Sequence, residues 1–191
     1  MKIRLLVLVG LLIVTLIVSG CTSTAPAEAN TSSSGTAAGG PFTLHVDSVK
    51  SGSVIANTYT CMGTSKSPEI TWENVPSGTQ GLALIMEDPN APSGTFTHWI
   101  AYNVPPESKT IPIGQVSQKD IFTGGLQGIN SAGNYGYFPP CPPLGSSHHY
   151  IFTLYALDTH LDVKDPSRQN IDAAMAGHIL NQSQVDTLAA R

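Results

Sequence analysis

Basic residues are few in this sequence, and they form no cluster along the chain. The 191 residues include 9 Lys and Arg against 13 Asp and Glu, which gives a formal net charge of −4 at pH 7. Proteins that hold a nucleic-acid backbone neutralise its phosphates with clustered Lys and Arg side chains. The lack of a basic run therefore excludes nucleic acid as an expected partner.

The motifs of the common catalytic chemistries are also missing. The sequence has no Gly-Lys-Ser/Thr loop for phosphates, no His-Glu-x-x-His zinc helix and no Gly-x-Ser-x-Gly elbow for a serine nucleophile. Serines are plentiful, but none lies in a motif that predicts its activation. We therefore expect no cofactor, and a protein that is not an enzyme.

A long apolar run is lacking as well, except for a short one at the N-terminus. Lys2 and Arg4 are followed by residues 5–18, which carry no charge. A membrane-spanning helix needs about 20 apolar residues, so this run is typical of a signal peptide. The Val-Ser-Gly sequence before Cys21 resembles the lipobox of prokaryotic lipoproteins. We predict a signal peptide over residues 1–20 and a lipid on Cys21; an uncleaved membrane anchor is the alternative.

The segment after the signal has almost no apolar bulk. Residues 22–40 are nearly all Thr, Ser, Ala, Gly and Pro, and Glu28 is their single charge. Such a segment cannot offset the entropy cost of ordering, so residues 21–40 are predicted to form a flexible tether. Residues 41–191 contain no internal repeat and have the size of one domain. Either interpretation of the N-terminus places this domain outside the cytoplasm, attached to the cell membrane.

Cysteine is rare, with three in the whole chain. If Cys21 carries a lipid, Cys61 and Cys141 remain as a pair in an oxidising compartment. A disulfide between them would close a loop of about 80 residues and stabilise the fold. Two separate buried thiols are the alternative, because the sequence does not place their Cα atoms within bonding distance.

Alternating patterns and short apolar runs predict a mainly β domain. Strands are expected at residues 42–49, 69–75, 81–86, 98–104 and 150–157. Residues 124–145 are rich in Gly, Pro and Asn and are expected to be loop. One helix is predicted near the C-terminus, with Asn170 as its cap and an apolar face of Ile171, Met175, Ile179 and Leu180. The pattern indicates an antiparallel β domain with one or two peripheral helices.

Three segments that contain polar residues lie at the ends of predicted strands. The segments are residues 88–92, 94–99 and 139–150. Loops that a rigid sheet holds in place commonly carry functional sites. These segments are therefore the candidates for chemistry in this chain.

The same segments resemble the motifs of the phosphatidylethanolamine-binding protein family, also called the Raf-kinase-inhibitor-like family, in its prokaryotic branch. Seven motifs occur in the family's order and at its spacing. They are SPEITW at 67–72, DPNAP at 88–92, HW at 98–99, PCPP at 140–143, HHY at 148–150, YALD at 155–158 and GH at 177–178. The resemblance covers residues 42–191. It implies a large central antiparallel sheet, a smaller sheet packed on it and few helices.

The resemblance also implies a small pocket for an anion such as phosphate, acetate or a phospholipid headgroup. Carried over residue by residue, its members are Asp88, His98, Pro140, His148 and Tyr150, with Pro140 at the rim. Imidazole and phenol groups can donate hydrogen bonds to an anion, whereas Asp88 is expected to orient a histidine. A cap of its own loop is the structural alternative for Asp88. His148 and His149 alternate along a strand, so His148 alone is expected to face the pocket.

Three places depart from the family's pattern. Asn90 stands where a second Asp is common, and His149 stands where Arg is usual. Phe138 and Pro139 replace the glycines that commonly precede Pro140, and a proline has no N–H to offer a phosphate. We therefore expect a pocket that is weaker or reshaped on this side.

The predicted export signal and the anion pocket that the resemblance implies together indicate a lipid-anchored extracytoplasmic binding module. Its expected ligand is a small anion or a headgroup. The family includes kinase and protease inhibitors, so inhibition of an unidentified protein partner is a further implied role. The alternative is a hydrolase that uses His98 or His148 as a general base, although no motif supplies a nucleophile. A metal site of Asp88, His98 and His148 is a minor hypothesis that the resemblance does not support.

Overall fold

The computed structural model describes residues 39–191 except 116 and 122. The predicted signal peptide, Cys21 and nearly all of the predicted tether lie outside the described residues, so they stay predictions. Within the described part of the chain, no helix is long and apolar enough to cross a membrane.

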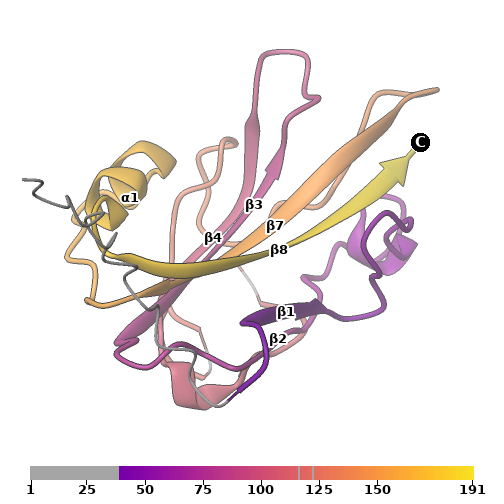
Figure 1. Ribbon diagram of the computed structural model, residues 1–191. Coiled ribbons are helices and arrows are strands. Elements are labelled where there is room, and N and C mark those ends of the chain that lie inside the picture. The colour runs from indigo at the N-terminus through magenta and orange to yellow at the C-terminus, as the bar shows by residue number, and fades with distance from the viewer. Residues whose placement is uncertain (1–38, 116, 122) are drawn as a thin grey trace, which may run out of the picture. The chain divides into compact units, whose positions relative to one another are not determined.

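Two antiparallel sheets and one short α-helix make up the described fold (Figure 1), which confirms the predicted mainly β class. The smaller sheet has the order β1 (Thr43–Val46), β2 (Ile70–Glu73), β5 (Thr110–Ile111). The larger sheet has the order β6 (Leu126–Gln127), β4 (Phe96–Val104), β3 (Gly81–Asp88), β7 (Ser147–Leu157), β8 (Ile179–Ala190). The helices are α1 (Arg168–Met175) and the 3₁₀ turns η1 (Asn57–Tyr59) and η2 (Pro106–Ser108).

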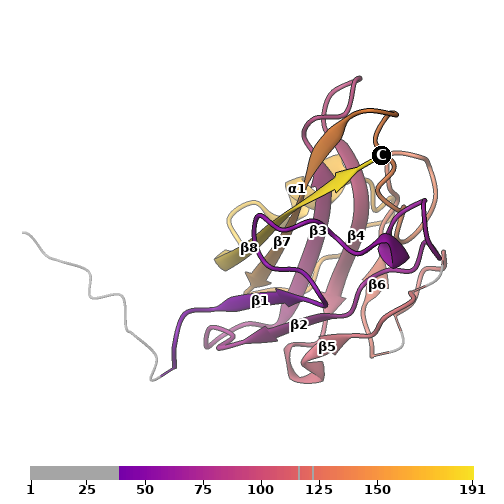
Figure 2. The same cartoon turned by 90° about the vertical axis from the view of Figure 1, so that its right-hand side faces the viewer.

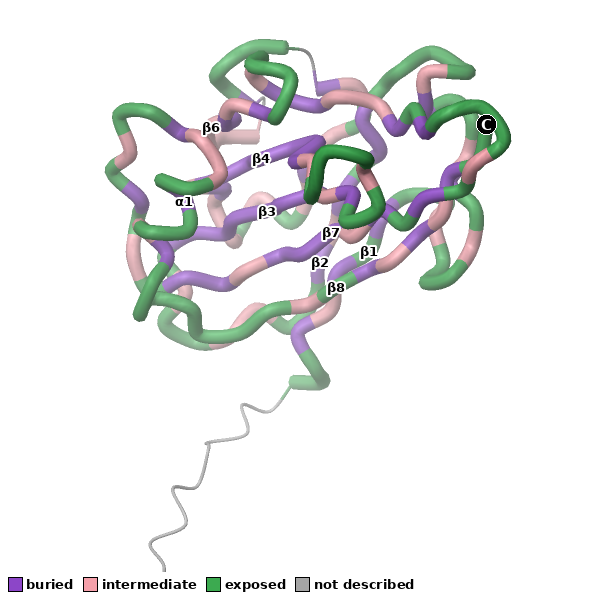
Figure 3. The backbone as a smooth tube through the Cα atoms, turned by 90° about the horizontal axis from the view of Figure 1, so that it is seen from above, coloured by how far each residue is buried: buried purple, intermediate pink, exposed green. Residues whose placement is uncertain are grey.

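The central strand β3 is covered on both faces. Its side chains alternate between two apolar clusters: Leu84 packs in the cluster that includes the small sheet, and Ile85 packs in the cluster that includes α1. In Figure 2 the small sheet lies across one face of β3, β4 and β7, and Figure 3 shows these strands as largely buried. Burial on both faces explains why β3 is a continuous apolar run rather than an alternating one.

The C-terminal segment differs from its prediction. α1 begins after Ser167, so Asn170 lies inside the helix and is not its cap. Gly177 follows the helix with φ 82°, a conformation that ends the helix and that glycine adopts without strain. The predicted helical positions Ile179 and Leu180 lie instead at the start of β8.

The whole of β8 was missing from the sequence prediction. It pairs with β7 along almost its entire length, yet its first four residues are exposed (Figure 3). Its buried alternation is confined to Val185, Thr187 and Ala189. A strand at the edge of a sheet buries fewer side chains, so its sequence carries a weaker alternating signal. The two-residue strand β6 likewise lies inside the segment expected to be loop.

A disulfide joins Cys61 to Cys141, with their Cα atoms 5.4 Å apart, so the alternative of two separate thiols is wrong. It links the segment after η1 to the loop before β7. Backbone and side-chain bonds reinforce the same junction: the Cys61 N–H donates to the Pro140 carbonyl at 3.0 Å, and the Tyr137 hydroxyl donates to the Tyr59 carbonyl at 2.7 Å.

Replacing both cysteines, Cys61→Ser with Cys141→Ser, is expected to lower the free energy of unfolding by about 4 kcal/mol. The reason is that a cross-link spanning roughly 80 residues removes much of the conformational freedom of the unfolded chain. Urea denaturation measures the change, and Met62→Ser, an exposed neighbour, is the matched control. A loss below about 1 kcal/mol would contradict a stabilising role for the cross-link.

Candidate functional site

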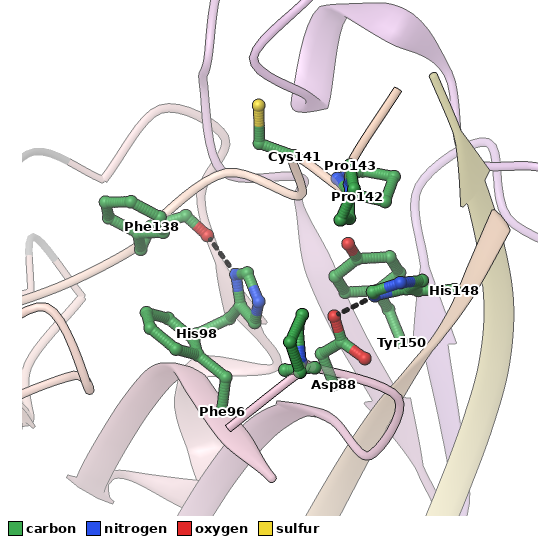
Figure 4. Close-up of a pocket in the computed structure, with 11 residues that line it drawn as sticks. Asp88, Phe96, His98, Phe138, Cys141, Pro142, Pro143, His148 and Tyr150 are labelled. Carbon is green, nitrogen blue, oxygen red and sulfur yellow. Dashed lines mark hydrogen bonds and ion pairs between the residues drawn. The ribbon is translucent and has the colours of Figure 1, made fainter. Parts of the chain in front are cut away.

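A hollow of about 200 Å³ opens where β3 ends and where β4 and β7 begin. Four buried polar residues contribute to its wall: Asp88, His98, His148 and Tyr150 (Figure 4). These are four of the five residues that the sequence assigned to an anion pocket. The fold therefore brings them together from three neighbouring strands.

A β-bulge in β4 gives His98 its direction. Met86 of β3 pairs with Trp99, but the next pair joins Glu87 to Thr97, so His98 has no opposite partner in β3. The Trp99 side chain is in the core shared with the small sheet, and strict alternation would turn His98 to the other face. Bulges commonly re-aim a side chain beside a functional site, and here His98 lines the hollow.

Asp88 uses both of its carboxylate oxygens. Its Oδ2 lies 2.7 Å from Nδ1 of His148, and its Oδ1 accepts the Asn90 N–H at 2.8 Å. A carboxylate oxygen can only accept, so Nδ1 of His148 carries the proton of this bond. Asp88 thus orients a histidine and also caps its own loop, which were the two alternatives considered for it.

His98 is fixed in a similar way by a neutral acceptor. Its Nδ1 lies 2.8 Å from the carbonyl oxygen of Phe138, so this nitrogen also donates. Burial lowers the pKa of His98 below its ordinary value of 6.5, although the Phe138 carbonyl opposes the shift. The ring is therefore neutral at pH 7, and its Nε2 then offers a lone pair rather than a proton.

Tyr150 supplies a hydroxyl that stays protonated. Burial, followed by the negative charge of Asp88, raises the pKa of Tyr150 well above its ordinary value of 10. Its ring meets the ring of His98 edge-on, with centroids 5.1 Å apart. A hydrogen bond to Asp88 contributes to the same shift, so the phenol stays protonated next to the imidazole of His98.

Two assignments from the sequence concern residues beside the hollow. His149 is exposed, and its Nδ1 lies 2.9 Å from a carboxylate oxygen of Asp186, on the opposite side of β7 from His148. Pro140 does not line the hollow: its carbonyl instead accepts the Cys61 N–H, and Cys141, Pro142 and Pro143 form that part of the wall.

The C-terminal residue is bonded to the loop that carries this wall. The Gly145 N–H donates to the Arg191 carbonyl at 2.7 Å, and the Arg191 N–H donates to Ser146 at 3.1 Å. The Arg191 guanidinium also lies 3.6 Å from the sulfur of Cys141. The end of β8 therefore supports the rim of the hollow.

Two apolar residues of the lining, Phe96 and Phe138, were not assigned to the site from the sequence. They line the hollow together with Pro142 and Pro143, which belong to the recognised PCPP motif. The only signal for the two phenylalanines was position, since each lies within two residues of a motif residue. Phe138 was noticed as a departure from the family's glycine, but not as part of the wall.

A metal centre is not supported. Among the described residues, no group of three or more His, Cys, Asp or Glu side chains is placed to hold a metal ion.

Comparison with known proteins agrees with this fold. Residues 45–189 match the family model described as phosphatidylethanolamine-binding protein. A UPF0098 protein of Methanothermobacter thermautotrophicus is 41% identical over 138 residues, which cover 72% of this chain and 91% of that protein. The crystal structure of the phosphatidylethanolamine-binding protein homologue CT736 of Chlamydia trachomatis superposes with a TM-score of 0.72 at 33% identity, covering 78% of this chain and 97% of that one.

This chain therefore belongs to the phosphatidylethanolamine-binding protein family. A further relative, from Mycobacterium tuberculosis, bears the name "Putative lipoprotein LppC" and is 37% identical over 137 residues, 71% of this chain and 65% of that protein. The word lipoprotein thus occurs in the name of a relative, while in this chain the lipid anchor is a prediction from the residues around Cys21.

The pKa of His98 predicts a pH dependence of stability. Because the folded state lowers this pKa, the unfolded chain binds the proton more readily. The contribution of His98 is fully present above pH 6.5, and it is lost as the pH falls below that value, by at most about 1.4 kcal/mol per pH unit. Urea denaturation at pH 7.5 and 5.5 should show a larger loss for the wild type than for His98→Gln, which can still donate to Phe138. Equal losses in the two proteins would contradict a buried neutral His98.

Proposed function

We propose that this chain is an extracytoplasmic, lipid-anchored binding protein whose hollow takes a small anion of the phosphate or headgroup type. The observation that carries the proposal is the convergence of His98, His148 and Tyr150 on one small hollow. Each imidazole has its Nδ1 occupied by a protein acceptor, which leaves Nε2 as the nitrogen available to a ligand.

The Asp88 carboxylate does not exclude an anion from the hollow. Its two oxygens already accept hydrogen bonds from His148 and from the Asn90 N–H, so they are not left facing a ligand without a partner. An anion that approaches the Nε2 atom of His98 favours the protonated, donating form of that ring. Tyr150 adds a phenol that stays protonated and that can turn its proton from Asp88 toward a ligand. The hollow thus becomes more complementary to an anion as it takes up protons.

Three observations support the anchored, extracytoplasmic location. The sequence before Cys21 resembles a lipobox, and a relative bears the name of a lipoprotein. The Cys61–Cys141 disulfide is typical of proteins outside the reducing cytoplasm. Inhibition of a partner protein stays a prediction from the family resemblance, and the proposal does not depend on it.

Inorganic phosphate is expected to raise the thermal midpoint of the purified protein, since a ligand that binds the folded state stabilises it. At about 100 times the dissociation constant, the gain is roughly 2.7 kcal/mol. His148→Ala should abolish the shift, whereas His149→Ala, the exposed neighbour on the opposite face of β7, should retain it. Thermal unfolding with and without phosphate is the measurement. The absence of any shift of the midpoint at tens of millimolar phosphate or acetate would contradict the proposed pocket.

Anion affinity should fall as the pH rises. The anion binds the protonated imidazole of His98, and the pKa of this ring in the ligand-free protein lies below 6.5. The affinity is therefore highest at a pH below the pKa of His98, and it declines by up to about tenfold per pH unit above it. Sulfate is the suitable probe because its own charge stays constant between pH 5 and 8. Calorimetric titration across this range should show the decline, and His98→Gln, with a donor that does not titrate, should flatten it. An affinity that rises with pH would refute the assignment of the imidazoles as donors.

A hydrolase is the second candidate, favoured by the Asp88–His148 pair. A carboxylate bonded to Nδ1 of an imidazole is the arrangement that orients a general base. The described lining holds no free serine, threonine or cysteine, since Cys141 is in the disulfide, so water would have to be the nucleophile. Turnover of p-nitrophenyl phosphate or p-nitrophenyl acetate, lost in His148→Ala, would establish this function in place of binding alone.

A further inference from the structure

The wall of the hollow is divided into a polar part and an apolar part. Asp88, His98, His148 and Tyr150 supply the polar groups, and Phe96, Phe138, Pro142 and Pro143 supply rings without donors. In Figure 4, Phe96 and Phe138 lie on the side of His98 that faces away from the Asp88–His148 pair. A bare oxyanion would use the polar part alone and would leave the apolar part in contact with water.

Phe138 is held firmly against His98. The Phe138 N–H donates to the His98 carbonyl at 2.8 Å, and the Phe138 carbonyl accepts from Nδ1 of His98 at the same distance. The Phe138 ring centroid is 5.5 Å from that of Phe96 and 5.9 Å from that of His98, in tilted contacts. Tilted aromatic contacts at these distances are favourable. The apolar wall is therefore built into the fold together with the histidine.

The size of the hollow limits what can occupy it. Its volume of about 200 Å³ is several times the roughly 30 Å³ that one water molecule occupies in the liquid. It is nevertheless below the roughly 300–1,000 Å³ of pockets that enclose drug-sized ligands. An anionic group with a few carbon atoms fits these limits, and a pair of acyl chains does not.

We propose that the ligand is a small anion bearing a compact apolar group, of the class of aryl or short-chain alkyl phosphate monoesters, and that Phe138 is the residue that selects it. This inference rests on the proposed anion pocket. The anionic group contacts His98, His148 and Tyr150, and the apolar group packs against the Phe138 ring.

An ammonium substituent, as in a free headgroup, is less suited to the same wall. Asp88 is the acidic residue of the lining, and both of its oxygens already accept hydrogen bonds from the protein. An ammonium group would therefore lose water against phenyl and proline rings with no free carboxylate to replace it. An apolar substituent gains from the same burial, by about fourfold in affinity for each methylene-sized group.

Calorimetric titration of the purified full-length protein with phosphate, phenyl phosphate and phosphoethanolamine tests the proposal. Phenyl phosphate is expected to bind at least about tenfold more tightly than phosphate, and phosphoethanolamine within about threefold of phosphate. In Phe138→Ala the ratio of the phenyl phosphate affinity to the phosphate affinity should fall below about threefold, and Phe138→Leu should restore part of it. Leu144→Ala is the matched control, because Leu144 belongs to the same loop but is 79% exposed and does not line the hollow.

The outcomes separate this inference from the proposed function. If phosphate binds and phenyl phosphate binds no better, or phosphoethanolamine binds best, the apolar ligand class is wrong while the anion pocket stands. If the wild-type preference persists in both Phe138 variants, the assignment to Phe138 is wrong. If neither phosphate nor phenyl phosphate binds, the pocket and the inference fail together.

Discussion

The hydrogen-bonded register that holds β3 between β4 and β7 is the constraint on which the rest of this molecule depends. It buries β3 on both faces and fixes where the apolar run stops, at Asp88. The same register places the first residues of β4 and β7 beside that carboxylate. A slip of one residue would turn Asp88 toward the opposite face and separate it from His148. The core and the candidate site therefore share one structural determinant.

Within the site, two histidines are held by acceptors of different charge. His148 bonds to a carboxylate, whereas His98 bonds to a backbone carbonyl, which carries no full charge to balance a proton on the His98 ring. Burial adds a further cost to charging His98. A bound anion can supply the missing compensation. Ligand binding and proton uptake are thus expected to be coupled through His98.

The sequence predicted the strands with strong patterns and the polar members of the site, and the reasons for its omissions are physical. β1, β2, β3, β4 and β7 follow from alternation or apolar runs, whereas β8 lies at an edge with an exposed first half and has no such pattern. The direction of His98 depends on a bulge, which is a property of the pairing between strands and is not encoded in either strand alone. Pro140 was placed by analogy, but the disulfide junction turns its carbonyl toward Cys61. The ring of Phe138 lies in the wall because its N–H bonds to the His98 carbonyl and its carbonyl bonds to Nδ1 of the His98 ring, and these bonds are visible only in three dimensions.

The bonds between Arg191 and the loop at Gly145 and Ser146 have a practical consequence for handling this protein. A peptide tag or reporter fused after Arg191 would emerge beside the wall formed by Cys141 and would compete with the contact between the guanidinium and that sulfur. Ligand measurements on such a fusion would report on an altered rim. The choice of fusion site therefore affects what is measured at this pocket, and a protein without a fusion directly after Arg191 is the appropriate reference.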